Sequence, residues 1–98
     1  MIKHVVMWKL KNEAQNNNKE ENAKLICEKL EALYGIIPEI VNIEVGINEN
    51  GGDFDVILIS EFNSYDDLKA YDSHPEHQKA KAFIIEVAEK REAIDYTI

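Results

Sequence analysis

Cysteine is nearly absent from this sequence, with one residue among 98. The single Cys27 excludes a disulfide within the chain and a zinc site built from clustered cysteines. It falls in an apolar stripe with helical spacing and has no evident basic neighbour to lower its pKa. We therefore interpret Cys27 as a core thiol and not as a nucleophile.

Long apolar runs are also absent, since the longest extend over only a few residues, as at 5–8 and 56–59. We therefore expect neither a membrane span nor the apolar core of a signal peptide.

Basic side chains are scarce: 11 lysines and arginines stand against 19 aspartates and glutamates, which makes the net charge −8. This balance argues against binding to nucleic acid or to an anionic membrane surface.

The hydrophobic content of 45% is high enough for a folded core. We expect one domain over residues 1–98, acidic and cytoplasmic. Residues 30–68 carry nine acidic side chains and no basic one, which we interpret as a solvated surface, with an acidic docking face as the alternative.

Hydrophobic periodicity predicts the order strand, helix, strand, strand, helix pair, strand. The strands are expected at residues 2–10, 39–47, 53–62 and 93–98, the first helix at 19–34, and the helix pair between Ser64 and Ala88. The polar run at 12–18 is typical of a loop.

Individual residues mark the ends of these elements. Gly35 is expected to cap the first helix, and Asn50-Gly51 indicates a hairpin because both residues tolerate a positive φ. The residue before a proline is forced out of the helical region, so His74-Pro75 is expected to divide the helix pair. Pro75 suits the first position of the second helix of the pair.

This order of elements predicts an α+β, ferredoxin-like βαββαβ fold, with a four-stranded, mainly antiparallel sheet and its helices on one face. The first and third strands carry apolar residues on both faces, and monomers seldom leave such a face exposed. We therefore expect a homodimer in which two sheets close into a dimeric α/β barrel. Its centre is expected near Val5, Met7, Ile57 and Ile59.

Three histidines are candidates for chemistry. His4 lies on the strand parity that we assign to the helix-covered face, where burial would perturb its pKa; a core histidine with a hydrogen-bond partner is the slightly favoured alternative. His77 is expected in the first turn of a helix, where the positive end of the helix dipole favours the neutral imidazole that a general base requires. Tyr71 lies just before the helix break and can place its hydroxyl beside His77. For His74, a structural cap is the favoured interpretation.

The spacing of His74 and His77 also resembles a metal-ligand pair, with Asp72 or Glu76 as a third ligand. Zinc sites usually hold such pairs on one continuous helix or a rigid turn, and Pro75 interrupts that geometry. We therefore expect no metal and no cofactor.

Three segments carry a resemblance to a known family. They are the opening Ile2–Lys11, the segment Asp67–His77 with its sequence DLKAYDSHPEH, and the ending Ala93–Tyr96. Together they resemble the stress-responsive A/B barrel (Dabb) domain family over essentially the whole chain. This resemblance implies the ferredoxin-like, dimeric α/β-barrel fold.

The same resemblance implies roles for particular residues. One enzyme branch of the family, a plant polyketide cyclase, uses a tyrosine and a histidine of this segment in a cofactor-free intramolecular aldol condensation. By resemblance, Tyr71 would hold or polarise the substrate carbonyl, and His77 would be the general base. His4 resembles a first-strand histidine that lines the same cavity.

Three functions remain open. The first is a cofactor-independent lyase, cyclase or isomerase acting on a carbonyl or polyketide-like compound, which requires an open cavity on which Tyr71, His77 and His4 converge. The second is a non-catalytic, stress-associated oligomer or a binder of a small apolar ligand, with a filled interior and a His77 that bonds the backbone. A third, weaker candidate is a cofactor-independent monooxygenase.

Overall fold

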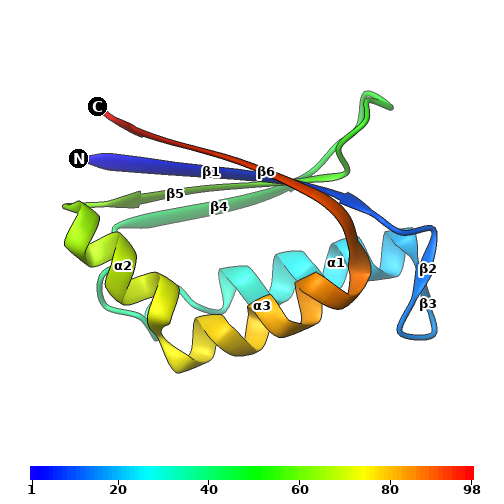
Figure 1. Cartoon of the computed structure of the whole chain (residues 1–98), viewed down its shortest axis with the longest axis horizontal. Helices are drawn as coiled ribbons and strands as arrows, with labels where there is room; N and C mark the ends of the chain where they lie inside the picture. The colour runs from blue at the N-terminus through cyan, green and yellow to red at the C-terminus, as the bar shows by residue number, and fades with distance from the viewer.

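The computed structural model describes all residues, Met1–Ile98, as a sheet layer above a helix layer (Figure 1). A four-stranded sheet has the order β4-β5-β1-β6, and every neighbouring pair is antiparallel. The elements are β1 Ile2–Leu10, β2 Glu13–Ala14, β3 Asn17–Asn18, α1 Lys19–Glu31, β4 Asn42–Ile47, β5 Val56–Phe62, α2 Tyr65–Ser73, α3 Pro75–Val87 and β6 Ala88–Thr97.

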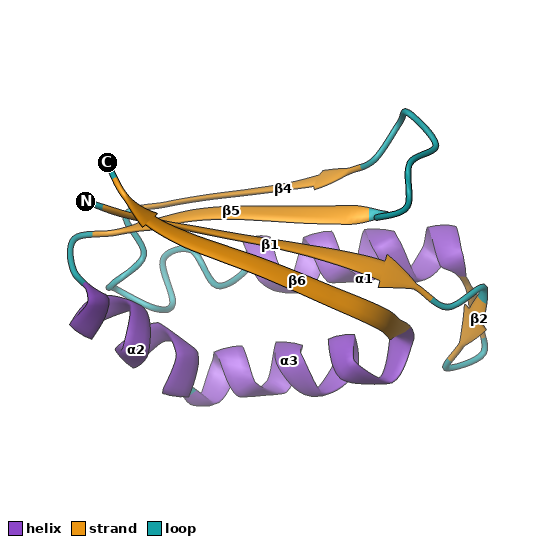
Figure 2. Cartoon of the chain, turned by 45° about the horizontal axis from the view of Figure 1, so that its top comes forward, coloured by secondary structure: helices purple, strands orange, loops and turns teal.

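All three helices lie on one face of this sheet, as Figure 2 shows. The predicted α+β, ferredoxin-like order of strands and helices is therefore confirmed. None of the helices is long and apolar enough to span a lipid bilayer.

The strand register decides which side chains face the helices. Val6 lies beside Leu58 of β5 and Ala93 of β6, and both Val6 and Leu58 are buried in the core of 17 residues between the two layers. On the other face, Val5 lies beside Ile59 and Ile94. The expected division of β1 into a covered face and an open face is confirmed.

Helix α1 begins as its sequence requires but ends earlier than expected. Asn18 and Glu21 form a capping box, in which the Asn18 side chain accepts a hydrogen bond from the Glu21 N–H. The helix ends at Glu31 and not at residue 34, because the N–H groups of Leu33 and Tyr34 bond three residues back. Gly35 adopts its positive φ of 89° beyond that tighter turn.

Two connections also differ from expectation. Residues 12–18 are not a simple loop, because β2 and β3 form a small ribbon whose turn residues Gln15 and Asn16 both have positive φ. The β4–β5 hairpin exists, but Ile47 pairs with Val56, so residues 48–55 form a longer loop. Asparagine side chains hold that loop, where only Gly51 has a positive φ.

Strand β6 begins at Ala88, five residues before the expected start at 93. Charged residues at 89–92 hide the alternating pattern that would reveal a strand. The backbone nevertheless pairs with β1 from Ala88 onward, with a register shift between Lys9 and Leu10. This correction places Arg91 on the sheet, opposite Trp8.

Candidate functional site

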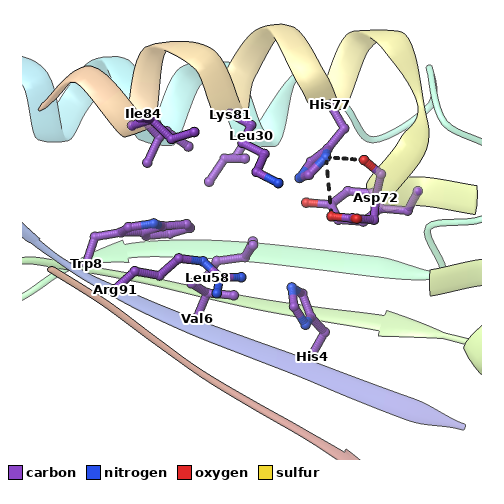
Figure 3. A pocket seen from close by; sticks show the side chains of 12 residues that line it. His4, Val6, Trp8, Leu30, Leu58, Asp72, His77, Lys81, Ile84 and Arg91 are labelled. Atoms are coloured by element: carbon purple, nitrogen blue, oxygen red, sulfur yellow. Dashed lines mark hydrogen bonds and ion pairs between the residues drawn. The ribbon is translucent and has the colours of Figure 1, made fainter. Parts of the chain in front are cut away.

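A cavity of about 70 Å³ lies between the sheet and helix α3. All three predicted site residues, His4, Tyr71 and His77, line it. Figure 3 shows His4 rising from the sheet and His77 descending from the helix layer toward the same space. The convergence that an enzyme requires is therefore present in the geometry.

The break between α2 and α3 brings Tyr71 and His77 together. His74 ends α2 with ψ of 135°, and Pro75 starts α3. Tyr71, in the last turn of α2, therefore faces His77, in the first turn of α3, with ring centroids 4.3 Å apart. His74 itself caps α3, since its Nδ1 accepts a hydrogen bond of 3.1 Å from the Glu76 N–H, which confirms the structural interpretation.

His77 is held in one tautomer by the backbone. Its Nδ1 lies 2.9 Å from the carbonyl oxygen of Asp72, which can only accept, so Nδ1 carries the proton and Nε2 keeps its lone pair (Figure 3). Burial is the main cause that lowers the pKa of His77, opposed by the bond to Asp72 and assisted by the charge of Lys81. The lowered pKa favours the expected neutral imidazole, and its main cause is desolvation and not the helix dipole.

Tyr71 is almost completely buried, with 1% of its surface exposed. Its ring packs against Phe62 at 5.0 Å between centroids. Its hydroxyl is buried and has no hydrogen-bond partner within the protein. Burial raises the pKa of Tyr71, which therefore remains a protonated donor at neutral pH.

His4 has a partner that sequence reasoning did not identify. Its Nδ1 forms a hydrogen bond with the Asp95 carboxylate on β6, and only 12% of the His4 side chain is exposed. His4 and Asp95 are direct cross-strand neighbours in the β1–β6 ladder. Only the strand register reveals this pair, because the two residues are 91 positions apart.

The two histidines with metal-ligand spacing have other partners. His74 Nδ1 caps α3 and His77 Nδ1 bonds the backbone of Asp72. No group of three or more histidine, cysteine, aspartate or glutamate side chains is arranged to hold a metal ion. Cys27 lies outside the cavity lining and is half-buried instead of fully buried, and desolvation raises the pKa of its thiol.

The sequence reasoning also missed several residues that line the cavity. Lys81 on α3 and Arg91 on β6 lie at its sides, and Trp8 and Ile84 supply apolar surface. Lys81 follows His77 by four residues, so helical spacing was a usable signal for it. Arg91 had no such signal, because its strand was expected to start later.

The four-stranded antiparallel sheet with helices on one face defines a ferredoxin-like α+β protein. The histidine–tyrosine cavity lies between its two layers. The family described as "Stress Responsive A/B Barrel Domain" (Dabb) matches residues 2–98. The chain belongs to this Dabb family, which confirms the resemblance.

Solved structures agree with this assignment. A dimeric, ferredoxin-like protein of unknown function from Bacteroides fragilis is 38% identical with a TM-score of 0.87, covering 99% of this chain and 95% of that one. A hydroxynitrile lyase from Passiflora edulis is 18% identical, with a TM-score of 0.81 and coverage of 99% and 92%. A cofactor-independent oxygenase from Streptomyces nogalater is 11% identical, with a TM-score of 0.77 and coverage of 99% and 91%. The last two show the fold alone. No curated protein matches the chain.

Proposed function

We propose that this protein is a cofactor-independent lyase or cyclase that acts on a small carbonyl compound in the cavity between sheet and helices. One observation carries the proposal: a histidine with a free Nε2 packs against the ring of a tyrosine whose buried hydroxyl no protein group engages. The histidine is a base, and the tyrosine is a hydrogen-bond donor for an oxygen that develops negative charge.

The reaction that these two groups support begins with enolisation. Nε2 of His77 removes a proton from the carbon next to a carbonyl group, and the electron pair of that C–H bond moves toward the carbonyl oxygen. The Tyr71 hydroxyl donates a hydrogen bond to this oxygen and stabilises the enolate. The enolate carbon attacks a second carbonyl of the same molecule, and the proton on His77 passes to the new alkoxide. The reverse sequence breaks the carbon–carbon bond and is the lyase direction.

His4 supplies a second proton-transfer group on the sheet side of the cavity. Asp95 accepts the hydrogen bond from Nδ1–H, which directs the lone pair of the neutral ring to Nε2. A histidine oriented by a carboxylate in this way is a competent acid or base. In the proposed reaction, Nε2 of His4 relays the proton of His77 to the new alkoxide and is neutral again at the end.

The bond between His77 and the backbone was the mark expected of a non-catalytic protein. It engages only Nδ1, however, and it leaves the nitrogen that a base uses without a hydrogen-bond partner. The cavity beside it also differs from the filled interior that the non-catalytic hypothesis expects.

The size of the cavity favours a short substrate. Its volume of about 70 Å³ is smaller than the roughly 150 Å³ of an apolar cavity that binds benzene. A short carbonyl compound therefore suits this site better than a long polyketide chain.

Deuterium exchange tests the proposed base without knowledge of the substrate. The protein is incubated with butanone in D₂O, and NMR follows the loss of the protons next to the carbonyl. We expect His77→Gln to lower the exchange rate about 100-fold or more, since general-base catalysis contributes roughly that much. His74→Asn is the matched control, because it removes an imidazole outside the cavity and retains a capping oxygen. Equal exchange by the natural protein and His77→Gln would end the role of His77.

We also propose that two copies of the chain associate through the open face of the sheet. That face presents Val5, Met7, Ile57 and Ile59, as expected, together with Ile94, whose surface is 61% exposed in the single chain. The Bacteroides fragilis protein is described as dimeric, which supports this assembly. A second sheet would remove these apolar side chains from water.

Sedimentation at micromolar concentration tests the dimer. We expect the natural chain to sediment as a dimer and Val5→Glu as a monomer, because the new charge would lie between Ile59 and Ile94. Ile36→Glu is the control, since Ile36 is an exposed isoleucine outside the sheet. A natural chain that sediments as a monomer would contradict this arrangement.

A further inference from the structure

Two positive side chains line the cavity from opposite layers. Lys81 extends from α3 and Arg91 from β6, and Figure 3 shows both reaching into the space between helix and sheet. Neither takes part in any of the seven ion pairs of the structure. Their charges are therefore not neutralised by a carboxylate of the protein.

This local charge opposes the charge of the whole chain. The chain carries a net charge of −8, yet the cavity lining holds two cations and a single acid, Asp72. The Asp72 side chain is 65% exposed, and Lys81 and Arg91 are exposed as well, so water screens all three charges and the lining keeps one positive charge in excess. A concave site with excess positive charge attracts anions, and its apolar walls strengthen that attraction.

Both cations are also close enough to act on the reacting groups. The charge of Lys81 contributes to the lowered pKa of His77, and the charge of Arg91 acts on the pKa of Tyr71 in the same direction. An anionic group that binds these cations would therefore lie near the proposed base and the proposed donor.

We propose that the cavity takes carbonyl compounds that carry a carboxylate, and that Lys81 and Arg91 bind this carboxylate. A guanidinium can hold a carboxylate through two parallel hydrogen bonds, and an ammonium adds a third donor. The proposal rests on the proposed function for the carbonyl end of the ligand, which reaches Tyr71 and His77. It adds the substrate class, namely short keto acids whose second carbonyl or β-hydroxyl group takes part in the forward or the reverse reaction.

The apolar surroundings fit the remainder of such a molecule. A surface groove of about 220 Å³ shares Trp8, Ile84, Ile85 and Arg91 with the cavity, and Ala88, Glu89 and Lys90 complete its lining. The alkyl part of a keto acid can therefore contact apolar side chains while its carboxylate remains beside the arginine.

A pair of matched probes tests the carboxylate site at equilibrium. Levulinate is a short keto acid, and levulinamide is its neutral counterpart of nearly equal shape. NMR titration of the protein should give a Kd for levulinate about tenfold lower than for levulinamide. Lys81→Met and Arg91→Met should each raise the Kd for levulinate about fivefold and leave that for levulinamide within roughly twofold.

Lys79→Met is the control for net charge. Lys79 lies on the same helix, its side chain is 73% exposed, and it pairs with Glu76 outside the cavity. An equal loss of affinity in Lys79→Met would overturn the proposal, because overall charge would then explain the preference. Equal Kd values for the two probes in the natural protein, or no binding of levulinate at millimolar concentration, would overturn it as well.

The same titration separates this proposal from the proposed function. His77→Gln should still prefer levulinate over levulinamide, because the cations are intact. If His77→Gln abolishes proton exchange while Lys81→Met and Arg91→Met leave levulinate binding unchanged, only the carboxylate site fails. The natural protein could instead fail to exchange the protons of butanone but still prefer levulinate, with the preference lost in Lys81→Met and Arg91→Met. Only the proposed function would then fail.

Discussion

Replacing Tyr71 by phenylalanine is expected to stabilise the fold. The tyrosine ring packs against Phe62 and His77, and a phenylalanine ring retains both contacts. The substitution removes only the buried hydroxyl, which has no hydrogen-bond partner within the protein. A buried polar group without a partner costs about 1–3 kcal/mol. We therefore expect the free energy of unfolding to rise by about 1 kcal/mol or more, and Tm by roughly 4–8 °C per kcal/mol.

Urea unfolding measures this change. The chain has a single tryptophan, Trp8, which is buried beside the cavity, so its fluorescence reports the loss of the core. All variants are compared at one protein concentration, since self-association makes apparent stability depend on concentration. Tyr65→Phe is the matched control: Tyr65 is 48% exposed, and its hydroxyl loss should change stability by less than about 0.5 kcal/mol.

A loss of stability in Tyr71→Phe would refute the reasoning. A decrease of about 1 kcal/mol would mean that the hydroxyl makes a favourable hydrogen bond in the folded protein. Tyr71 would then not be a donor held ready for a substrate oxygen. If Tyr71→Phe raises stability and slows deuterium exchange, the hydroxyl lowers the stability of the fold but serves the reaction. This is the result we expect for a functional residue.

Three further predictions concern pH, the second histidine and the first helix. Because the pKa of His77 is lowered below its ordinary value of 6.5, the folded state binds fewer protons there than the unfolded state does. This contribution to stability is present above pH 6.5 and is lost as the pH falls below it, and urea titrations of His77→Gln should show a weaker decline. Asp95→Asn should leave the deuterium exchange of butanone and the binding of levulinate within about twofold, because His4 acts at the oxygen of a second carbonyl and butanone has none; a tenfold slower exchange would contradict that role. Asn18→Ala should lower the free energy of unfolding by about 1 kcal/mol in urea, since it removes the capping box of α1, and an unchanged midpoint would contradict this role.

The sequence predicts the helices and strands that bury one face in the core and expose the other. Periodicity identifies β1 and α1 because burial requires apolar residues at regular spacing. Their ends are less well predicted, as α1 ends at Glu31 and β6 begins at Ala88. The starts of α1 and α3 follow side-chain signals, Asn18 and Pro75, whereas the end of α1 and the start of β6 are set by backbone hydrogen bonds without such a signal.

The part of the site that is local in sequence was predictable. Tyr71 and His77 are six positions apart, and a proline between them limits the path of the backbone. Their contact at 4.3 Å follows from that break, so the sequence was sufficient to place the candidate base beside the candidate donor.

The tertiary structure alone decided the rest of the site. Asp95 reaches His4, and Arg91 reaches the cavity, only because β6 pairs with β1 in one particular register. A shift by one residue would turn both side chains to the open face of the sheet. The sequence by itself therefore determined the βαββαβ order, the apolar faces and the Tyr71–His77 pair, which depend on local spacing. The charges around that pair depend on contacts between residues distant along the chain, and such contacts exist only once the sheet has formed.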